Sequence, residues 1–322
     1  MQETELGSGW AALGRSMVRL GLFALAGVAV LGYATSGGWL TSLLQHFPAY
    51  YAWTGFLLFV TAWFSRSSIA VRALCLLSAL GFALFWASPR LPMDAPELSD
   101  PQPVRVVWAN VQHKTRNVEA LLDWLDTLDP PAEVLGLAEV HSEESLRLLR
   151  ERFPHGLHDR ATGVALLARA RPLEQQSVWV QHGRPILHLQ TEVNGRPLDL
   201  VAAHALVPSG GGQPGIAAMA QLLRGLDHAA LIADLNLTPW AREFRGLLRD
   251  GDLRDGRRGR WPLKTWGPRG SRWVGLPIDH ALVRGAVLVE DFVVGPDLGS
   301  DHRPLVVDLL RGSETETVAG TH

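Results

Sequence analysis

Cysteine is almost absent from this 322-residue sequence, which contains only Cys75. A lone cysteine forms no internal disulfide, so the fold must rest on a hydrophobic core, as in cytoplasmic proteins and in large extracytoplasmic bacterial domains. An excess of positive charge is missing too: the formal net charge is -2, and residues 104–312 carry equal numbers of acidic and basic side chains. Non-specific DNA-binding domains are usually basic because they neutralise phosphates, so the composition argues against that class.

Charge is also scarce in the first quarter of the chain, where three apolar runs cover about 17–34, 50–64 and 69–87. A membrane-spanning helix needs roughly 20 mostly apolar residues. We therefore predict three transmembrane helices within residues 1–88. The second run reaches that length only if residues 39–47 contribute, so two spans are the alternative. The charged residues before position 90 are Glu3, Glu5, Arg15, Arg19, Arg66 and Arg72.

The basic residues in this stretch predict its orientation, because loops rich in Lys and Arg stay in the cytoplasm. Arg15 and Arg19 precede the first run, Arg66 and Arg72 join the second to the third, and the loop 35–49 has no basic residue. We expect a cytoplasmic N-terminus and, after three crossings, an extracytoplasmic domain. The predicted location is the bacterial cytoplasmic (inner) membrane, with several spans.

The remaining chain has the pattern of a water-soluble α/β domain. Residues 89–103 are rich in proline and acid and predict an extended tether. Short β-rich runs alternate with amphipathic helical patterns over 104–312, and a helix is expected at 117–128 with Asn117 as its N-cap. We expect the tail 313–322 to be disordered. The predicted strands are 104–110, 134–140, 162–169, 186–193, 198–205, 229–236, 278–283, 287–294 and 304–310.

Polar residues that can bind metal or transfer protons recur at the ends of these apolar strands, which we expect to be their carboxyl ends. Each alone has an ordinary explanation as a cap, a turn residue or a satisfied buried group. Together they predict one site, because a buried carboxylate costs several kcal/mol unless it is paired or coordinated. The residues are Asn110, Glu139, His204, Asp234, Asn236, Asp279, Asp301 and His302.

Their sequence contexts resemble the endonuclease/exonuclease/phosphatase superfamily, which includes deoxyribonuclease-I-like nucleases, neutral sphingomyelinases and inositol polyphosphate phosphatases. The matching motifs occur in order as LAEVHS (137–142), IADLN (232–236), PIDH (277–280) and GSDHRPL (299–305). This resemblance covers about 104–311. It implies an α/β (α+β) fold of the deoxyribonuclease-I type, in which a four-layer β-sandwich is flanked by helices, and a metal-dependent phosphoesterase activity.

By the same resemblance, Glu139 would be the principal ligand of Mg²⁺, with Asn110 and Asp301 as further metal-site residues. Mg²⁺ suits oxygen donors of this kind, and Mn²⁺ is the alternative. Two positions depart from the family pattern: Ala203 replaces the usual Thr before the histidine, and Ala233 replaces the usual Gly before the aspartate. Both are small residues, so we expect altered packing rather than lost catalysis.

The resemblance assigns the catalytic roles to five further residues. Asp234 would orient or deprotonate the attacking water, and Asn236 would hold the phosphate. His302, oriented by Asp279, would stabilise or protonate the phosphoryl oxygens. His204 would be a second catalytic histidine. Such a mixture suits phosphoryl transfer, where imidazole and metal neutralise charge that builds on phosphorus and a carboxylate positions the nucleophile.

Three spans, a tether and an outward catalytic domain resemble the bacterial membrane phosphatases associated with teicoplanin and vancomycin resistance. Those are linked to undecaprenyl pyrophosphate, and the stretch 264–280 resembles theirs. Trp266, Arg269 and Arg272 are the expected substrate-binding residues. The expected partners are a lipid phosphate or pyrophosphate and the bilayer. We do not expect nucleic acid as a partner, and no obligate protein partner is evident.

Three alternatives stay open: a phosphodiesterase of the phospholipase-C or sphingomyelinase type, an extracytoplasmic nuclease, and a catalytically inactive binding module. The segment 242–272 holds ten basic and four acidic residues, interleaved with tryptophans. It suits an anionic membrane surface, a solvated basic loop or a single-stranded nucleic-acid site, so it does not discriminate among them.

Overall fold

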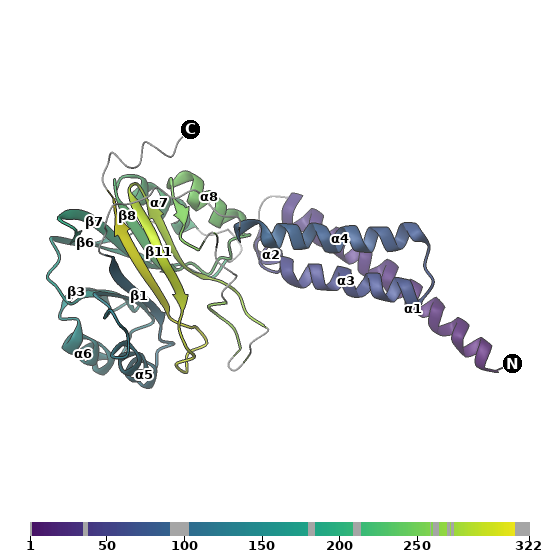
Figure 1. Ribbon diagram of the computed structural model, residues 1–322, viewed down its shortest axis with the longest axis horizontal. Coiled ribbons are helices and arrows are strands. Elements are labelled where there is room, and N and C mark those ends of the chain that lie inside the picture. The colour runs from purple at the N-terminus through teal and green to yellow at the C-terminus, as the bar shows by residue number, and fades with distance from the viewer. Residues whose placement is uncertain are drawn as a thin grey trace. The chain divides into compact units, whose positions relative to one another are not determined.

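A computed structural model shows the chain as two compact units: the N-terminal residues up to Leu91, joined by Trp240–Arg242, form the first, and most of the remaining chain forms the second (Figure 1). The described residues within 2–90 of the first unit form helices joined by turns, and the second unit is built on two β-sheets. The residues described are 2–34, 38–90, 103–179, 184–208, 214–257, 259, 264–268, 271 and 274–312.

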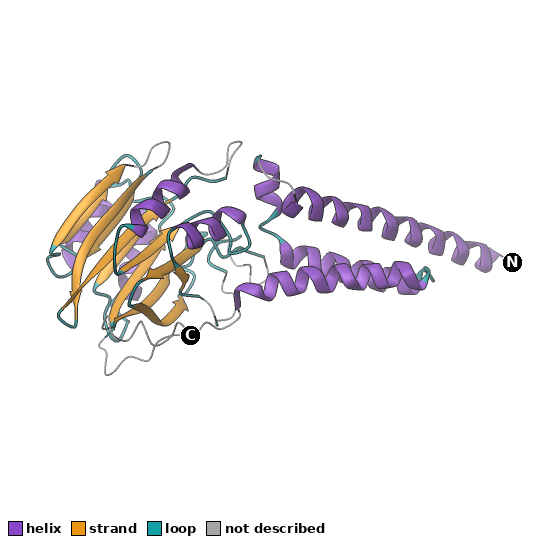
Figure 2. Cartoon of the chain, turned by 90° about the horizontal axis from the view of Figure 1, so that it is seen from above, coloured by secondary structure: helices purple, strands orange, loops and turns teal. Residues whose placement is uncertain are grey.

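In the helical unit, α3 packs against both α1 and α4, and the helices run alongside one another in Figure 2. Glycine permits a close approach of α3 and α4, because a Cβ on Gly55 would lie 2.9 Å from the backbone nitrogen of Ala79. Proline opens α3 at its first turn, and the Ser68 hydroxyl caps α4. The elements are α1 (Gln2–Ala29), the π-helical η1 (Val30–Ala34), α2 (Trp39–Leu44), α3 (Pro48–Phe64), α4 (Ile69–Ala87) and the short η2 (Ser88–Arg90).

Two of the three predicted spans have the length and apolar composition of a membrane helix, at Gly9–Ala34 and Ile69–Ala87. The third, α3, has 17 residues, or about 25 Å at 1.5 Å per residue, which is short of a full crossing. The large apolar side chains of the two candidate spans point outward: Phe23 is 78% exposed and Leu84 is 73% exposed. Water-soluble proteins seldom expose apolar surface on this scale, which supports an association of these two helices with a membrane.

The second unit contains two six-stranded sheets. Sheet A has the strand order β11-β12-β1-β2-β4-β3, and sheet B has the order β5-β6-β7-β8-β10-β9. The strands of sheet A are β1 (Val104–Asn110), β2 (Val134–Ala138), β3 (His155–Asp159), β4 (Val164–Ala168), β11 (Val287–Val294) and β12 (Leu305–Arg311). Those of sheet B are β5 (Glu174–Trp179), β6 (Pro185–Val193), β7 (Arg196–His204), β8 (Ala229–Asp234), β9 (Arg254–Asp255) and β10 (Asp279–Arg284).

The main core lies between the two sheets, where alternate residues of their central strands meet, and it includes the fully buried Trp108 of β1. Gly136 of the neighbouring strand β2 makes room for this indole, because a Cβ there would lie 2.8 Å from the Trp108 ring. A sandwich of two sheets covered by helices matches the predicted deoxyribonuclease-I-like architecture.

Helices cover the outer faces. On sheet A, α5 (Thr115–Leu125) and α6 (Glu143–Arg152) form a second core with Val107 and Leu135, and Figure 1 shows them beyond β1 and β3. On sheet B, Phe244 of α8 (Arg242–Asp250) packs against the ring of His280, at 4.4 Å between centroids. The remaining helix is α7 (Pro214–Arg224).

Some local predictions were wrong. Helix α5 begins at Thr115, and Asn117 does not cap it; its side-chain amide donates to the carbonyl of Val111 at 2.9 Å. The strands β3 and β5 were not predicted, because β5 is an edge strand with mostly exposed polar residues and lacks the apolar pattern. The Arg-rich segment is not uniformly solvated, since Arg257 is only 5% exposed.

Candidate active site

The predicted site residues gather at one edge of the sandwich because of how the strands pair. β1 runs parallel to β2 and β7 runs parallel to β8, so Asn110, His204 and Asp234 end strands on that edge. β10 is antiparallel to β8, with Asp279 opposite Asp234. The prediction that all these residues follow carboxyl ends was therefore wrong for Asp279, and also for Asp301 and His302. Those two precede β12, which is antiparallel to β1.

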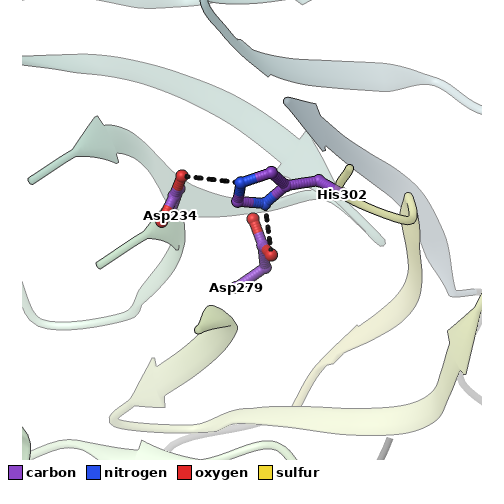
Figure 3. Close-up of side chains that lie close together, drawn as sticks. All are labelled: Asp234, Asp279 and His302. Atoms are coloured by element: carbon purple, nitrogen blue, oxygen red, sulfur yellow. Dashed lines mark hydrogen bonds and ion pairs between the residues drawn. The ribbon is translucent and has the colours of Figure 1, made fainter. Parts of the chain in front are cut away.

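His302 is held by a buried carboxylate. Its Nδ1 lies 2.9 Å from Oδ2 of Asp279, and Figure 3 shows the ring between Asp279 and Asp234. The other oxygen of Asp279 accepts a hydrogen bond from the Trp108 indole at 2.9 Å, and the Thr265 hydroxyl accepts from the Asp279 backbone N–H at 3.0 Å. Asp279 is completely buried, so its bonds fix the orientation of the imidazole.

Asp234 lies at the centre of the edge, and three nitrogen atoms approach its Oδ2. Nδ2 of Asn110 is 3.1 Å away, Nε2 of His204 is 3.5 Å away and Nε2 of His302 is 3.7 Å away. Oδ1 accepts the backbone N–H of Asn236 at 3.0 Å. A carboxylate placed among donors in this way can bind and deprotonate a water molecule.

His204 differs from His302 in its other neighbour. A guanidinium nitrogen of Arg184 lies 2.6 Å from its Nδ1. Arginine only donates, so Nδ1 accepts and the proton of the neutral ring is on Nε2, which faces Asp234. Arg184 therefore sets the tautomer of His204 and brings a positive charge to the edge of the site.

These neighbours give the two histidines different charge states. Burial alone lowers the pKa of His302, but the charges of Asp279 and Asp234 and the hydrogen bond to Asp279 outweigh it and raise this pKa to about 10. Burial and the charge of Arg184 lower the pKa of His204 to about 3. At neutral pH the site holds one imidazolium and one neutral imidazole.

The pKa values of the two aspartates also differ. Burial and the negative charge of Asp279 raise the pKa of Asp234 to about 7, although His302 opposes the rise. Burial raises the pKa of Asp279 as well, but the charge of His302 and the hydrogen bonds that Asp279 receives hold it below its ordinary value. A base with a pKa near neutrality beside a permanently ionised carboxylate is the arrangement expected for general base catalysis.

Glu139 is the residue best placed to bind a metal ion. It follows β2 with φ of 65°, a left-handed conformation that costs a non-glycine residue free energy and is concentrated at functional sites. Oε1 accepts from Nδ2 of Asn110 at 3.1 Å, and Oε2 lies 2.8 Å from Nε2 of His113. Hard carboxylate oxygens at a partly exposed edge fit a divalent cation such as Mg²⁺ or Mn²⁺.

The hydrogen bonds of these side chains limit which of them can bind a metal ion. Asp234, Asp279 and His302 offer ligand atoms within 4.8 Å of one another. Both oxygens of Asp279 already accept hydrogen bonds, however, so this carboxylate orients His302 and is not free to bind a metal. Asn110 turns its nitrogen toward the carboxylates, while its oxygen accepts the backbone N–H of Gln112. In this orientation Asn110 joins Glu139 to Asp234.

The other predicted residues lie around this centre. Asn236, with φ of 52°, donates its side-chain amide to the carbonyl of Ala205. Oδ2 of Asp301 accepts from the Trp266 indole at 3.2 Å, and no described hydrogen bond joins Asp301 to Glu139. Trp266 is 36% exposed and so remains available for contact. Arg269 and Arg272 lie outside the described residues.

Four residues of the site were not predicted: Trp108, Thr265, Arg184 and His113. Trp108 is an inward residue of an apolar strand, and nothing in its local pattern separates it from an ordinary core residue. Thr265 and Arg184 lie outside the apolar runs. His113 offered a signal, because it follows Asn110 closely in NVQHK and is a titratable residue beyond a strand end.

The fold and the site together define a hydrolase for phosphate esters. A family model described as the Endonuclease/Exonuclease/phosphatase family matches residues 107–302, and the chain belongs to this family. Its members are phosphodiesterases and phosphatases that depend on divalent metal, so this chain is a metal-dependent phosphoesterase. No curated protein sequence matches the chain.

Solved structures share the fold at low identity. The endonuclease/exonuclease/phosphatase from Bacteroides vulgatus has a TM-score of 0.54 and 16% identity, covering 65% of this chain and 98% of that one. TDP2 from D. rerio, complexed with a single-strand DNA product, has a TM-score of 0.53 and 17% identity, covering 65% and 99%. A family protein from Leptotrichia buccalis has a TM-score of 0.52 and 13% identity, covering 64% and 99%.

Proposed function

We propose that this protein is a membrane-anchored, Mg²⁺-dependent phosphatase for a lipid phosphate or pyrophosphate, such as undecaprenyl pyrophosphate, at the outer face of the bacterial cytoplasmic membrane. One observation carries the proposal: the same chain joins outward-facing apolar helices to a phosphoesterase domain whose acid, amide and imidazole positions are all filled. An enzyme held at a bilayer meets lipid headgroups far more often than dissolved polymers.

Each residue has a distinct task in this reaction. Asp234 orients the attacking water and accepts its proton, and His302, as an imidazolium, stabilises or protonates the phosphoryl oxygens. His204 donates from Nε2, and Asn236 holds the phosphate. Glu139 would hold Mg²⁺, which when bound supplies positive charge to the phosphoryl group.

Charge and chain length also support a headgroup substrate. Arg184 places a cation beside the catalytic edge, which favours an anionic phosphate, while the domain as a whole carries no net charge to attract a nucleic-acid polymer. Residues 89–103 can extend at most roughly 50 Å at about 3.5 Å per residue. The catalytic domain therefore stays near the membrane surface.

The proposal is tested by hydrolysis assays on the purified full chain in lipid nanodiscs. Three substrates are compared at equal concentration with Mg²⁺: a polyprenyl pyrophosphate, a phosphodiester lipid and single-stranded DNA. We expect the pyrophosphate to be hydrolysed with the highest kcat/KM. A higher kcat/KM for the phosphodiester lipid or for DNA would replace this function with a phospholipase-type diesterase or a nuclease.

Metal dependence is tested separately with Glu139→Gln, which keeps the shape of the side chain and removes its charge. We expect lower turnover that high Mg²⁺ partly restores, and Mn²⁺ in place of Mg²⁺ shows which cation serves better. Full activity of this variant in the presence of a chelator would end the metal assignment.

Reporter fusions test the orientation. Alkaline phosphatase joined after residue 312 matures only outside the cytoplasm, so we expect an active fusion. A green fluorescent protein joined at the same point should stay dark after export. A fluorescent fusion together with an inactive phosphatase would place the catalytic domain in the cytoplasm.

A further inference from the structure

A long apolar groove runs between α1 and α4 of the helical unit. α3 packs against both helices, whereas α1 and α4 hardly contact each other, and a space of about 670 Å³ remains between them. This volume lies in the range of about 300–1,000 Å³ that is usual for ligand pockets. Hydrocarbon side chains form nearly all of its walls, among them Leu22, Ala26 and Leu74.

The two ends of the groove differ in chemistry. Arg19 is the only charged residue that lines it, and no described hydrogen bond or ion pair involves its guanidinium. At the other end Tyr33 packs edge-on against Phe85, with ring centroids 5.0 Å apart, and Phe82 lies beside them at 6.3 Å from Tyr33. The groove therefore has a cationic end and an end lined by aromatic rings.

The groove is long enough for one hydrocarbon chain. From Arg19 to Tyr33 the helical rise is about 21 Å at 1.5 Å per residue. Half of a bilayer's hydrocarbon core is about 15 Å thick, so a chain that starts at the level of Arg19 can run its full length inside the groove.

From these features we infer that the groove binds one acyl chain of an anionic phospholipid, with the lipid phosphate at Arg19 and the chain running toward Tyr33. The inference rests on the membrane anchoring proposed above but not on the proposed substrate. Arg15 and Arg19 mark the cytoplasmic end of α1, so this lipid belongs to the inner leaflet. It is therefore a different molecule from a substrate at the outer face.

A second copy of the chain is the competing occupant, because Ala26, Ala29, Ser78 and Gly81 are small residues of the kind that bring helices together. Charge favours the lipid. A second α1 seated in the groove would bring its own Arg15 or Arg19 toward Arg19, whereas a phosphate would neutralise this cation.

The test uses the full chain in nanodiscs that carry a trace of phosphatidylglycerol with a diazirine near the end of one acyl chain. After photolysis, labelled peptides are mapped by mass spectrometry. We expect the label on the groove-facing residues of α1 and α4 near Tyr33 and Phe85. Label spread evenly over the outer faces of α1, α3 and α4 would show bulk lipid only and overturn the inference.

One variant and a matched control sharpen this test. A Cβ added at Gly81 would meet no neighbouring atom within 4 Å, so Gly81→Leu should fill the groove and reduce the label several-fold. Ala73 is exposed on the same helix but does not line the groove, so Ala73→Leu should leave the label unchanged. Equal labelling in both variants would contradict the assignment.

The headgroup is tested with Arg19→Gln. In native mass spectrometry the wild type should retain phosphatidylglycerol in preference to phosphatidylcholine, and the variant should lose this preference.

Other outcomes would contradict the inference. A dimer whose dissociation opens the groove to label would assign the groove to a second copy. Hydrolysis of a water-soluble phosphate ester should be unaffected, which separates this inference from the proposed reaction. Recovery of the protein in the soluble fraction would overturn the anchoring, and the groove assignment with it.

Discussion

The two sides of Asp234 show how neighbours decide what a histidine can do. His302 and His204 are both buried, and their Nε2 atoms lie 3.7 Å and 3.5 Å from the same carboxylate oxygen. On the far side of its ring, His302 meets Asp279 and carries a positive charge, whereas His204 meets Arg184 and stays neutral. Burial lowers the pKa of both rings, and the residue behind each ring separates them: Asp279 raises the pKa of His302, whereas Arg184 lowers that of His204 further.

Replacing His302, the charged histidine of the two, should lower activity the most. Loss of one preorganised donor to the phosphoryl group typically costs about 10² to 10³ in rate, or about 3 to 4 kcal/mol. His302→Ala should lower kcat by that factor, measured as phosphate release, while circular dichroism and membrane insertion stay unchanged. Turnover near the wild-type value, or a loss explained by unfolding, would make His302 a structural residue.

Neutralising the carboxylate behind His302 should have a smaller effect. Asp279→Asn still accepts a hydrogen bond, and loss of such an orienting partner typically costs about 10- to 100-fold in activity. Removing the negative charge also lowers the pKa of His302, so the alkaline limb of the pH–rate profile should move to lower pH. An unchanged limb would mean that Asp279 does not maintain the imidazolium.

Activity should be less sensitive to a change beside the neutral histidine, His204. Arg184→Gln keeps a donor to Nδ1 of His204 and removes the positive charge, so the pKa of His204 should rise. We expect kcat to fall about tenfold or less, consistent with a hydrogen bond to a charged group of about 1.5 kcal/mol. The limb of the profile that reports His204 lies near pH 3 in the wild type and should move to higher pH in the variant. Arg184→Lys is the matched control, which retains the charge and should keep the limb in place.

His280 is a buried histidine outside the active site. We expect its replacement to change stability and not activity. It follows Asp279 in β10 but points to the opposite face, where Nε2 donates to the Leu237 carbonyl and Nδ1 accepts from Arg257. Burial and the charge of Arg257 lower the pKa of His280 well below its ordinary value. The unfolded chain therefore takes up a proton below about pH 6.5 that the folded chain does not.

That difference has a definite sign. The free energy of unfolding should fall by up to roughly 1.4 kcal/mol per pH unit for each such proton as the pH drops below about 6.5. Melting temperatures of the full chain between pH 7.5 and 5 should show this fall. His280→Gln should lower the melting temperature at every pH but flatten its pH dependence. A parallel decline in the variant would assign the effect to other groups.

Sequence patterns were sufficient for the residues at strand ends but not for their partners. Polar residues that interrupt apolar strands predicted Asn110, Glu139, His204 and Asp234 as one edge, since strand pairing brings such ends together. The bond from Trp108 to Asp279 joins residues 171 positions apart across two sheets. Register between stacked sheets is a tertiary property, which a local pattern does not contain.

For the fold, the sequence predicted the central strands but not the exposed edge strand. Apolar central strands such as β1, β2 and β8 have an unmistakable pattern, whereas the exposed edge strand β5 has a surface composition. The tautomer of His204 was not predictable either, because it depends on where Arg184 lies in space and not on any spacing in the sequence.

The hydrogen bond between Trp108 and Asp279 also bears on how the enzyme is made. Trp108 belongs to the first strand of the domain and Asp279 to one of the last, and His302 comes still later. During synthesis the apolar helices leave the ribosome long before Trp108, Asp279 and His302 can come together. With the membrane anchoring proposed above, a growing chain would enter the bilayer before its hydrolytic centre exists, and a product that stops short of residue 302 would lack His302 and be inactive.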